Sequence, residues 1–386
     1  MLVVIPKEIL NEEKRVAAIP ETVGKLRAKG MEVAVEAGVG AGIFIEDQEY
    51  AKAGATIVDD VEQLFAKANV ILKVKQPIFN EAKQKHEVDM MPKGSTLVTF
   101  LHPAAPDSHD IVRKLRDRQI TSFTMDGIPR TSRAQRMDAL TSMSTVTGYR
   151  AVLDAAMKLP RFLPMIGTAI GPIKPANVLV VGTGVVGLQA VATAKRLGGV
   201  VKAWDIREAA RSEAGSLGAK VVGFDVPKEL AIAEGGYAKR LPDDWLAKEQ
   251  AAIVEVVAAS DIVVLSALVP GGKAPIIVTK DAVSKMKPGS VIVDVSIDQG
   301  GNCELTQPSK EILVNSVRIC GLQNIPGRMA MHSSWLYANN MFHYIDNLFK
   351  TVPGEPDLKD DIVAASLVTM NGKIVFRPAL EAMGEV

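Results

Sequence analysis

Short apolar runs alternate with amphipathic segments along most of the chain, and they form two separate series. In the first series, six runs are typical of buried strands: residues 2–5, 32–36, 55–57, 70–74, 96–100 and 120–124. The second series comprises a run that begins at Val178, followed by residues 200–205, 220–222, 262–266, 290–295 and 317–320. Alternation of this kind predicts parallel sheets with right-handed crossovers. We therefore expect an α/β fold with two doubly wound, Rossmann-like domains and a cleft between them.

The two series are separated by residues 130–159, a segment that is polar at first and then helical in pattern. A chain of 386 residues exceeds the usual size of one hydrophobic core, so two domains are expected. A long amphipathic helix is predicted over residues 333–350 and would return the chain to the first domain. The predicted division is a discontinuous N-terminal domain, residues 1–135 and 335–386, and a second domain, residues 145–330.

A glycine-rich motif, Gly182-x-Gly184-x-x-Gly187, lies between an apolar run and an alanine-rich helical segment. Gly182 would permit a tight turn, Gly184 would let backbone N–H groups approach a pyrophosphate, and Gly187 would allow close packing of helix and strand. Asp205 stands at the end of the next predicted strand, where its carboxylate could accept both ribose hydroxyls and would repel a 2′-phosphate. The second domain is therefore predicted to bind NAD(H) in preference to NADP(H), an inference that the nearby Arg207 weakens slightly.

Composition and charge argue against several other classes of protein. Lys and Arg number 45 and Asp and Glu 44, so there is no excess of positive charge that would attract nucleic acid or an anionic membrane. Cys303 and Cys320 are the only cysteines, which predicts neither a disulfide framework nor a metal site and favours a reducing, cytoplasmic compartment. Residues 176–194 carry no charge, but their glycines favour a buried strand–turn–helix over a membrane span. The N-terminus lacks the pattern of a signal peptide.

Motifs along the whole chain resemble the family that unites alanine dehydrogenase with the NAD(H)-binding alpha subunit of proton-translocating NAD(P) transhydrogenase. The resemblance extends from Pro6-Lys7-Glu8 and Arg15-Val16-Ala17, through the glycine-rich motif and its helix, to residues 371–380. Three segments resemble transhydrogenase specifically: residues 130–141, residues 234–239 and the run from Asp361. For the alpha subunit, the resemblance implies direct hydride transfer between NADH on this chain and NADP on a partner. It also implies a homodimer, a membrane subunit, an NADP-binding beta subunit and a location peripheral to the inner membrane.

Residues 130–141 resemble the loop that holds the nicotinamide end of NAD(H) in transhydrogenase. Matching positions imply that this end is held by Arg130, Gln135, Asp138 and Thr141. The alternative for Arg130, Arg133 and Arg136 is a solvated basic helix face. Residues 234–239 resemble the mobile loop that closes over the nucleotide, which would explain the long irregular segment 224–244. The rest of the implied nucleotide site consists of Val185, Asp205, Ile206, Arg207, Gly236, Tyr237, Gln250 and Leu268.

Four other positions match the substrate site of alanine dehydrogenase: Arg15, Lys75, His102 and Asp298. The resemblance implies that Arg15 and Lys75 bind a carboxylate and a carbonyl oxygen of a small 2-oxo acid, and that His102 relays a proton. Asp298 would orient the polar groups. Taken singly, a histidine before a proline is explained by a turn, and an aspartate before glycines by a capped loop. The favoured interpretation is the transhydrogenase alpha subunit. The alternatives are a self-sufficient NAD-dependent amino acid or 2-oxo acid dehydrogenase and a catalytically silent NAD-binding regulator.

Overall fold

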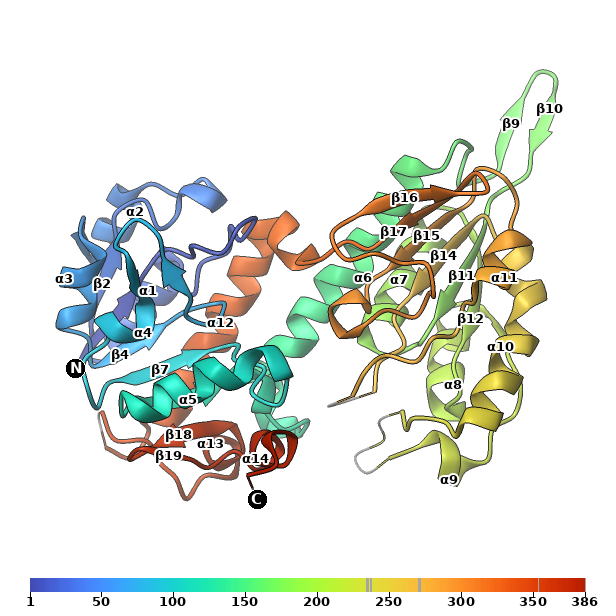
Figure 1. Ribbon diagram of the computed structural model, residues 1–386. Helices are drawn as coiled ribbons and strands as arrows, with labels where there is room; N and C mark the ends of the chain where they lie inside the picture. Colours follow the sequence, from blue (N-terminus) through green and yellow to red (C-terminus); the bar gives the residue numbers. More distant parts are fainter. Residues whose placement is uncertain (234–235, 237, 270–271, 353, 386) are drawn as a thin grey trace. The chain divides into compact units, whose positions relative to one another are not determined.

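The computed structural model in Figure 1 describes residues 1–385 except 234, 235, 237, 270, 271 and 353. It divides into two compact units, each with its own sheet and core. Unit 1 contains Met1–Met143 and Pro326–Val386, and unit 2 contains Ser144–Ile325. The first boundary lies inside the helix α6 (Ala139–Lys158), which is therefore shared between the units.

Unit 1 is built on an eight-stranded sheet in the order β19-β18-β8-β7-β4-β1-β2-β3, as far as the residues are described. Neighbouring strands from β8 to β3 run parallel, and their apolar residues are buried because helices cover both faces. The strands are β1 (Leu2–Ile5), β2 (Glu32–Glu36), β3 (Thr56–Val58), β4 (Val70–Leu72), β7 (Thr96–Thr99), β8 (Thr121–Thr124), β18 (Leu367–Met370) and β19 (Lys373–Ile374).

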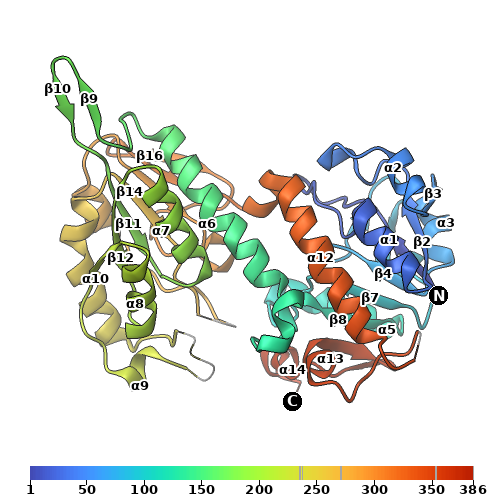
Figure 2. The same cartoon turned by 180° about the vertical axis from the view of Figure 1, so that it is seen from behind.

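Two cores lie on opposite faces of the unit 1 sheet. One core is closed by α1 (Pro20–Ala28), α12 (Ala330–Leu348) and α13 (Asp361–Ser366), and Figure 2 shows α1 beside α12. The other is closed by α3 (Val61–Ala66) and α5 (His109–Asp117), with α14 (Arg377–Met383) at its edge. The remaining elements are α2 (Asp47–Lys52), α4 (Glu87–Met90) and a hairpin of β5 (Phe79–Asn80) and β6 (Lys85–His86).

Unit 2 contains a seven-stranded sheet, counted over its described residues, in the order β13-β12-β11-β14-β15-β17-β16. The helices α6, α7 and α8 cover one face, and α10 and α11 cover the other. The strands are β11 (Asn177–Val181), β12 (Val200–Trp204), β13 (Lys220–Val222), β14 (Ile262–Leu265), β15 (Val291–Asp294), β16 (Glu311–Val314) and β17 (Val317–Cys320). The other elements are α7 (Val185–Arg196), α8 (Glu208–Ser216), α9 (Lys228–Ala231), α10 (Asp243–Ala258), α11 (Lys280–Ser284) and a hairpin of β9 (Ile166–Thr168) and β10 (Gly171–Ile173).

The predicted α/β fold with parallel, Rossmann-like sheets is confirmed, but each sheet also has an antiparallel edge. In unit 2 the sequence pattern did not reveal β16, because as an edge strand it alternates between exposed and half-buried positions. A tight turn through Asn315 and Ser316, both with positive φ (49° and 62°), joins β16 to β17. In unit 1 the antiparallel strands β18 and β19 extend the sheet beyond β8.

Two further sequence predictions concern long segments. The uncharged run 176–194 divides into the strand β11 and the helix α7, as predicted. Among the described residues, no helix is both long and apolar enough to cross a membrane. The predicted helix 333–350 is α12, which begins at Ala330 and ends at Leu348.

Candidate functional site

Most of the predicted site residues follow the carboxyl ends of parallel strands, which share one edge in each sheet. In unit 2 the glycine motif follows β11, Asp205 follows β12, and Leu268 and Asp298 follow β14 and β15. In unit 1, Arg15 lies beyond β1, Lys75 beyond β4 and His102 beyond β7. This edge is where doubly wound folds place their ligands.

The glycine motif forms a turn, and two of its positions have room only for glycine. Gly182 has φ +83°, and a Cβ atom there would lie 2.7 Å from the backbone nitrogen of Ala267. A Cβ atom at Gly187 would lie 1.9 Å from the carbonyl oxygen of Gly182. Gly184 is the N-cap of α7, and a Cβ atom there would meet no atom within 4 Å. The first N–H groups of this twelve-residue helix have no partner within the helix, so its open N-terminus fits a diphosphate.

Asp205 is 6% exposed, and its carboxylate already has partners inside the protein. Oδ2 accepts hydrogen bonds from the backbone nitrogen of Thr183 at 2.7 Å and from Nη2 of Arg207 at 2.8 Å. Oδ1 accepts from the backbone nitrogen and Nε of Arg207 at 2.8 and 3.0 Å. Because the guanidinium covers both oxygens, a ribose hydroxyl would reach Asp205 only after Arg207 moves aside. Nη1 of Arg207 also lies 3.4 Å from the carbonyl oxygen of Gly236.

The other positions assigned to the nucleotide have ordinary structural surroundings. Val185 is the first residue of α7, and Ile206 is half-buried after β12. Gln250 on α10 donates from Nε2 to the carbonyl oxygen of Ile276 at 2.7 Å. Leu268 is 37% exposed. Tyr237, the remaining position, lies outside the described residues.

A buried polar network beside the glycine turn was not identified from the sequence. Asn302 is fully buried, accepts from the backbone nitrogen of Ala267 at 2.9 Å and donates to the carbonyl oxygens of Ala267 and Pro275, both at 2.8 Å. Asp294, at the end of β15, accepts from the backbone nitrogens of Asn302 and Cys303 at 2.8 and 3.0 Å. The network fixes the segment that Gly182 approaches. The signal that could have revealed it is an acid directly after the buried run 291–293.

Arg15 and Lys75 act on one buried carboxylate in unit 1. Arg15 donates from Nε and Nη2 to the two oxygens of Glu13 at 2.8 and 2.6 Å, and from Nη1 to the sulfur of Met143 at 3.1 Å. Burial alone would raise the pKa of Glu13, but the hydrogen bonds and charge of Arg15, with the charge of Lys75, lower it overall. A substrate carboxylate would therefore share the guanidinium of Arg15 with Glu13.

Lys73, two residues before Lys75, is 1% exposed and fixes the backbone that follows β4. Its Nζ lies 2.8 Å from Oε1 of Glu87 and 3.4 Å from Oε2 of Glu8. Glu8 in turn accepts from the backbone nitrogen of Val74 at 2.6 Å, and Glu87 from that of Ile78 at 2.9 Å. Lys73 is thus a buried structural residue, whereas the predicted site residue Lys75 is half-buried.

His102 is held by Asp126 from the next strand end. Its Nδ1 lies 3.1 Å from Oδ1 of Asp126, and its backbone nitrogen donates to Oδ2 at 2.5 Å. The ring stacks on Phe100 with 5.7 Å between centroids, and the backbone has φ +47°, which is strained for a non-glycine residue. Burial would raise the pKa of Asp126, but the charge of His102 and hydrogen bonds from His102 and Thr124 lower it.

The four predicted dehydrogenase positions are thus divided between the units. Arg15, Lys75 and His102 belong to unit 1, at one sheet edge. Asp298 belongs to unit 2, is exposed, and accepts from Nε2 of Gln323 at 2.8 Å.

The segment 130–141 is a 3-10 turn, η4 (Ser132–Met137), followed by α6. Asp138 caps α6, because Oδ1 accepts from the backbone nitrogen of Thr141 at 2.8 Å and Oδ2 from its hydroxyl at 2.6 Å. The structure thus brings Asp138 and Thr141 together, while Arg130 and Gln135 are exposed. The alternative of a solvated basic helix face does not apply to Arg133, because this residue forms ion pairs with Asp360 and Asp361.

Two α/β units with polar residues at the strand ends, and a glycine turn at a helix N-terminus in unit 2, are the architecture typical of dinucleotide-binding enzymes. Family models cover both halves. Residues 4–147 match the alanine dehydrogenase/PNT N-terminal domain, and residues 151–377 match the alanine dehydrogenase/PNT C-terminal domain. The chain belongs to the alanine dehydrogenase/PNT family of oxidoreductases, which confirms the resemblance identified in the sequence.

Individual relatives come from both branches of the family. The first part of NAD(P) transhydrogenase subunit alpha from Rhodospirillum rubrum is 42% identical over 389 residues, covering 100% of both chains. The alanine dehydrogenase of Halomonas elongata is 34% identical over 394 residues, covering 100% of this chain and 97% of that protein. Among solved structures, the transhydrogenase of Sinorhizobium meliloti has a TM-score of 0.82 at 37% identity, covering 97% of this chain and 99% of that one.

A pH dependence of stability follows from Glu249 on α10, which is 3% exposed and accepts from Nε1 of Trp204 at 3.0 Å. Burial raises the pKa of Glu249 to about 7 from 4.5. Because the folded state holds this proton more tightly than the unfolded state, stability falls as pH rises from 4.5 to 7. Glu249→Gln should therefore be more stable than the wild type at pH 8, by up to about 3 kcal/mol, and equal to it below pH 4.5.

Unfolding measured at pH 8 and at pH 4 checks this expectation. The exposed Glu255, on the same helix, provides the control, and Glu255→Gln should change stability by less than about 0.5 kcal/mol. A Glu249→Gln variant that is less stable than the wild type at pH 8 would contradict the argument.

Proposed function

We propose that this chain is the NAD(H)-binding alpha subunit of a proton-translocating NAD(P) transhydrogenase. Bound NAD(H) would exchange a hydride directly with NADP(H) held by a partner subunit. The observation that carries the proposal is the match over the whole chain, at 42% identity, to a transhydrogenase alpha subunit, compared with 34% for an alanine dehydrogenase. The partners would be an NADP-binding beta subunit and a membrane subunit, with this chain peripheral to the cytoplasmic side of the inner membrane.

Residues of unit 2 are suited to the adenosine and diphosphate end of the cofactor. Gly182 and Gly187 allow the tight turn, and the open N-terminus of α7 at Gly184 would hold the diphosphate. Asp205 would accept a ribose hydroxyl once Arg207 has moved from its carboxylate.

Residues of unit 1 would hold the nicotinamide end. Arg130 and Gln135 are exposed, and Asp138 and Thr141 fix the start of α6 after the turn. Transfer between two nicotinamides moves no proton at the reacting carbon, so these residues need only orient the ring and exclude water.

A specific observation favours the second candidate, an NAD-dependent amino acid or 2-oxo acid dehydrogenase. The half-exposed His102 ring has its Nδ1 fixed by Asp126 at 3.1 Å, an arrangement used by acid/base histidines. Arg15 and Lys75 both act on Glu13, so two cations are close enough to one another to bind the carboxylate and the carbonyl oxygen of one 2-oxo acid.

An exposed apolar hairpin supports a homodimer. Between β9 and β10, Ile170 is 99% exposed, and Phe162, Met165 and Ile173 nearby are 53%, 67% and 40% exposed. A two-stranded hairpin is barely stable alone, and clustered exposed apolar side chains are typical of an interface. A second copy of this chain would cover them.

The first prediction from this proposal concerns cofactor choice. Asp205→Ala should weaken NADH binding about tenfold or more by removing a charge-assisted hydrogen bond, while NADPH binding should not weaken, because the freed Arg207 can pair with the 2′-phosphate. Calorimetric titration measures both affinities. Asp225→Ala removes an exposed acid that pairs with Arg211 and should change neither. Equal affinity of the wild type for NADH and NADPH would contradict the prediction that the site prefers NAD(H).

The second prediction separates the two candidate functions. Mixed with an NADP-binding transhydrogenase subunit, the chain should catalyse hydride exchange between nucleotides, and Gln135→Asn should slow it by about a hundredfold through misplacement of the ring. His102→Ala should leave the exchange nearly intact, because no proton is transferred. If the chain is a dehydrogenase, NADH should instead be oxidised by a 2-oxo acid, and His102→Ala should cost about a hundredfold or more.

The deciding assay is a screen of 2-oxo acids with NADH, with and without ammonium, on the wild type and His102→Ala. Turnover that this substitution abolishes would replace the transhydrogenase proposal with the dehydrogenase. Exchange activity lost in Gln135→Asn, without any 2-oxo acid turnover, supports the alpha subunit.

The third prediction tests the homodimer. Ile170→Asp should shift the protein from dimer toward monomer in sedimentation experiments, because a charge would be buried in the interface. Leu313→Asp, on the edge strand β16 where Leu313 is 65% exposed, should not. A monomeric wild type, or a dimer unaffected by Ile170→Asp, would rule out this interface.

A further inference from the structure

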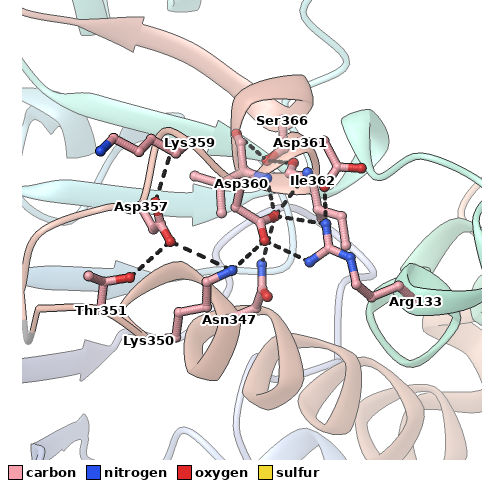
Figure 3. Close-up of polar contacts among 11 residues, drawn as sticks. Arg133, Asn347, Lys350, Thr351, Asp357, Lys359, Asp360, Asp361, Ile362 and Ser366 are labelled. Atoms are coloured by element: carbon pink, nitrogen blue, oxygen red, sulfur yellow. Dashed lines mark hydrogen bonds and ion pairs between the residues drawn. The ribbon is translucent and has the colours of Figure 1, made fainter.

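Asp360 is a buried carboxylate that joins three segments of unit 1 (Figure 3). Its side chain is 3% exposed. It caps α13, since Oδ1 accepts from the backbone nitrogens of Ile362 and Val363 at 3.0 and 3.3 Å. Near the end of α12, Lys350 donates from Nζ at 2.5 Å and Asn347 from Nδ2 at 3.2 Å.

The third segment is the turn η4, which reaches Asp360 through Arg133. Nη1 of Arg133 lies 2.6 Å from Oδ2 of Asp360 and Nη2 lies 3.3 Å from Oδ1, and Arg133 also pairs with Asp361. The guanidinium thus binds one carboxylate through two nitrogens, the geometry that fixes position as well as charge. Figure 3 shows Arg133 extending from its turn to the acids at the start of α13.

The turn η4 has a second attachment on the other side of Gln135. Nδ2 of Asn340, on α12, donates to the carbonyl oxygen of Arg136 at 2.8 Å. Arg133 and Arg136 flank Gln135 in sequence, so a side chain and a backbone group hold the turn on either side of it. Short 3-10 turns have few and weak hydrogen bonds of their own, so such tertiary contacts decide their conformation.

The surroundings of Asp360 favour its charged form. Burial would raise the pKa of its carboxyl, but hydrogen bonds from Arg133, Lys350, Asn347 and the α13 backbone hold it well below the usual range. Arg133 and Lys350 are both cationic partners of the buried Asp360, so the ion pair with Arg133 favours the position of η4 in which the guanidinium reaches this carboxylate, while Lys350 still pairs with it if Arg133 is removed.

We propose that Asp360 is a positioning residue, which acts through Arg133 to fix the turn Ser132–Met137 and so holds Gln135 where it can orient the nicotinamide ring. The inference rests on the proposed function, because only there does the placement of Gln135 govern the rate. Asp360 itself touches no reacting group. Its effect should appear in turnover more than in affinity for the adenosine half of the cofactor.

The test uses Arg133→Ala and Asp360→Asn in the full-length chain. Arg133→Ala leaves Asp360 its bonds to Lys350, Asn347 and the α13 backbone, so the fold should survive even where Asp360→Asn unfolds. Both variants should increase hydrogen–deuterium exchange of residues 131–138 about tenfold and lower kcat of the hydride exchange about tenfold, with ADP binding to unit 2 unchanged. The double variant should be no worse than the poorer single one, since both substitutions break one link.

Asp357→Asn is the matched control. Asp357 lies in the same loop, accepts from Thr351 at 2.9 Å and from the backbone nitrogen of Lys359 at 3.2 Å, and pairs with Lys350 at 3.6 Å, so these contacts are made within the loop and not with the turn η4. It should change neither amide exchange in η4 nor kcat. Additive effects of the two substitutions, or unchanged exchange and kcat in Arg133→Ala, would overturn the positioning role.

The two proposals fail in different ways. A wild type without hydride-exchange activity contradicts the proposed function, and because the inference rests on that function, it falls too. An active wild type whose kcat is insensitive to Arg133→Ala contradicts only the inference.

Discussion

A carboxylate that is buried away from water needs hydrogen-bond donors or cations as partners. Both units of this protein contain buried carboxylates that meet this requirement. In unit 1, the buried acids Glu13 and Asp360 each bind an arginine through two nitrogens, and Asp126 lies against His102. In unit 2, Asp205 binds Arg207 and Asp294 binds backbone N–H groups. The contacts Arg133–Asp360 and His102–Asp126 join segments that are distant in the sequence, whereas Arg15–Glu13 and Arg207–Asp205 each act within one loop. Both kinds of contact give irregular loops defined positions where regular secondary structure does not hold them.

The kind of partner decides what each acid can do. Arg15 lowers the pKa of Glu13, and the charge and hydrogen bonds of His102, with a hydrogen bond from Thr124, lower the pKa of Asp126, although burial opposes both shifts. Asp294 accepts from backbone and hydroxyl donors and, among the described residues, not from a cation, and burial raises its pKa overall. Asp205 differs again, because the cation that satisfies it also covers the position predicted for a ribose hydroxyl. Ligand binding there and internal pairing compete for the same oxygens.

Features that depend on a local sequence pattern were predicted correctly. Buried polar residues whose partners lie far away in the chain were not identified. Parallel strands and the glycine turn follow from apolar periodicity and from positions such as Gly182 and Gly187 that leave no room for a Cβ atom. The buried Asp294, four residues before the predicted Asp298, was not identified, because a sequence does not tell which acid faces the core. Arg133 and Asp360 are 227 residues apart, so no local sequence pattern indicates that they form an ion pair. The roles of the predicted site residues remain predictions.

One framework carries residues for two chemistries, which agrees with the rule that function depends on sites and not on folds. A dehydrogenase needs a proton relay at its carbonyl substrate, and the pair His102–Asp126 has the geometry for it. Hydride transfer between two nicotinamides needs no relay, so its rate depends on orientation and exclusion of water. The ion pair of Arg133 with the buried Asp360 takes no part in proton transfer, but it attaches the turn that contains Gln135 to α13. Such an anchor has a catalytic consequence only where positioning is the principal contribution, so the role proposed for Asp360 depends on the transhydrogenase proposal.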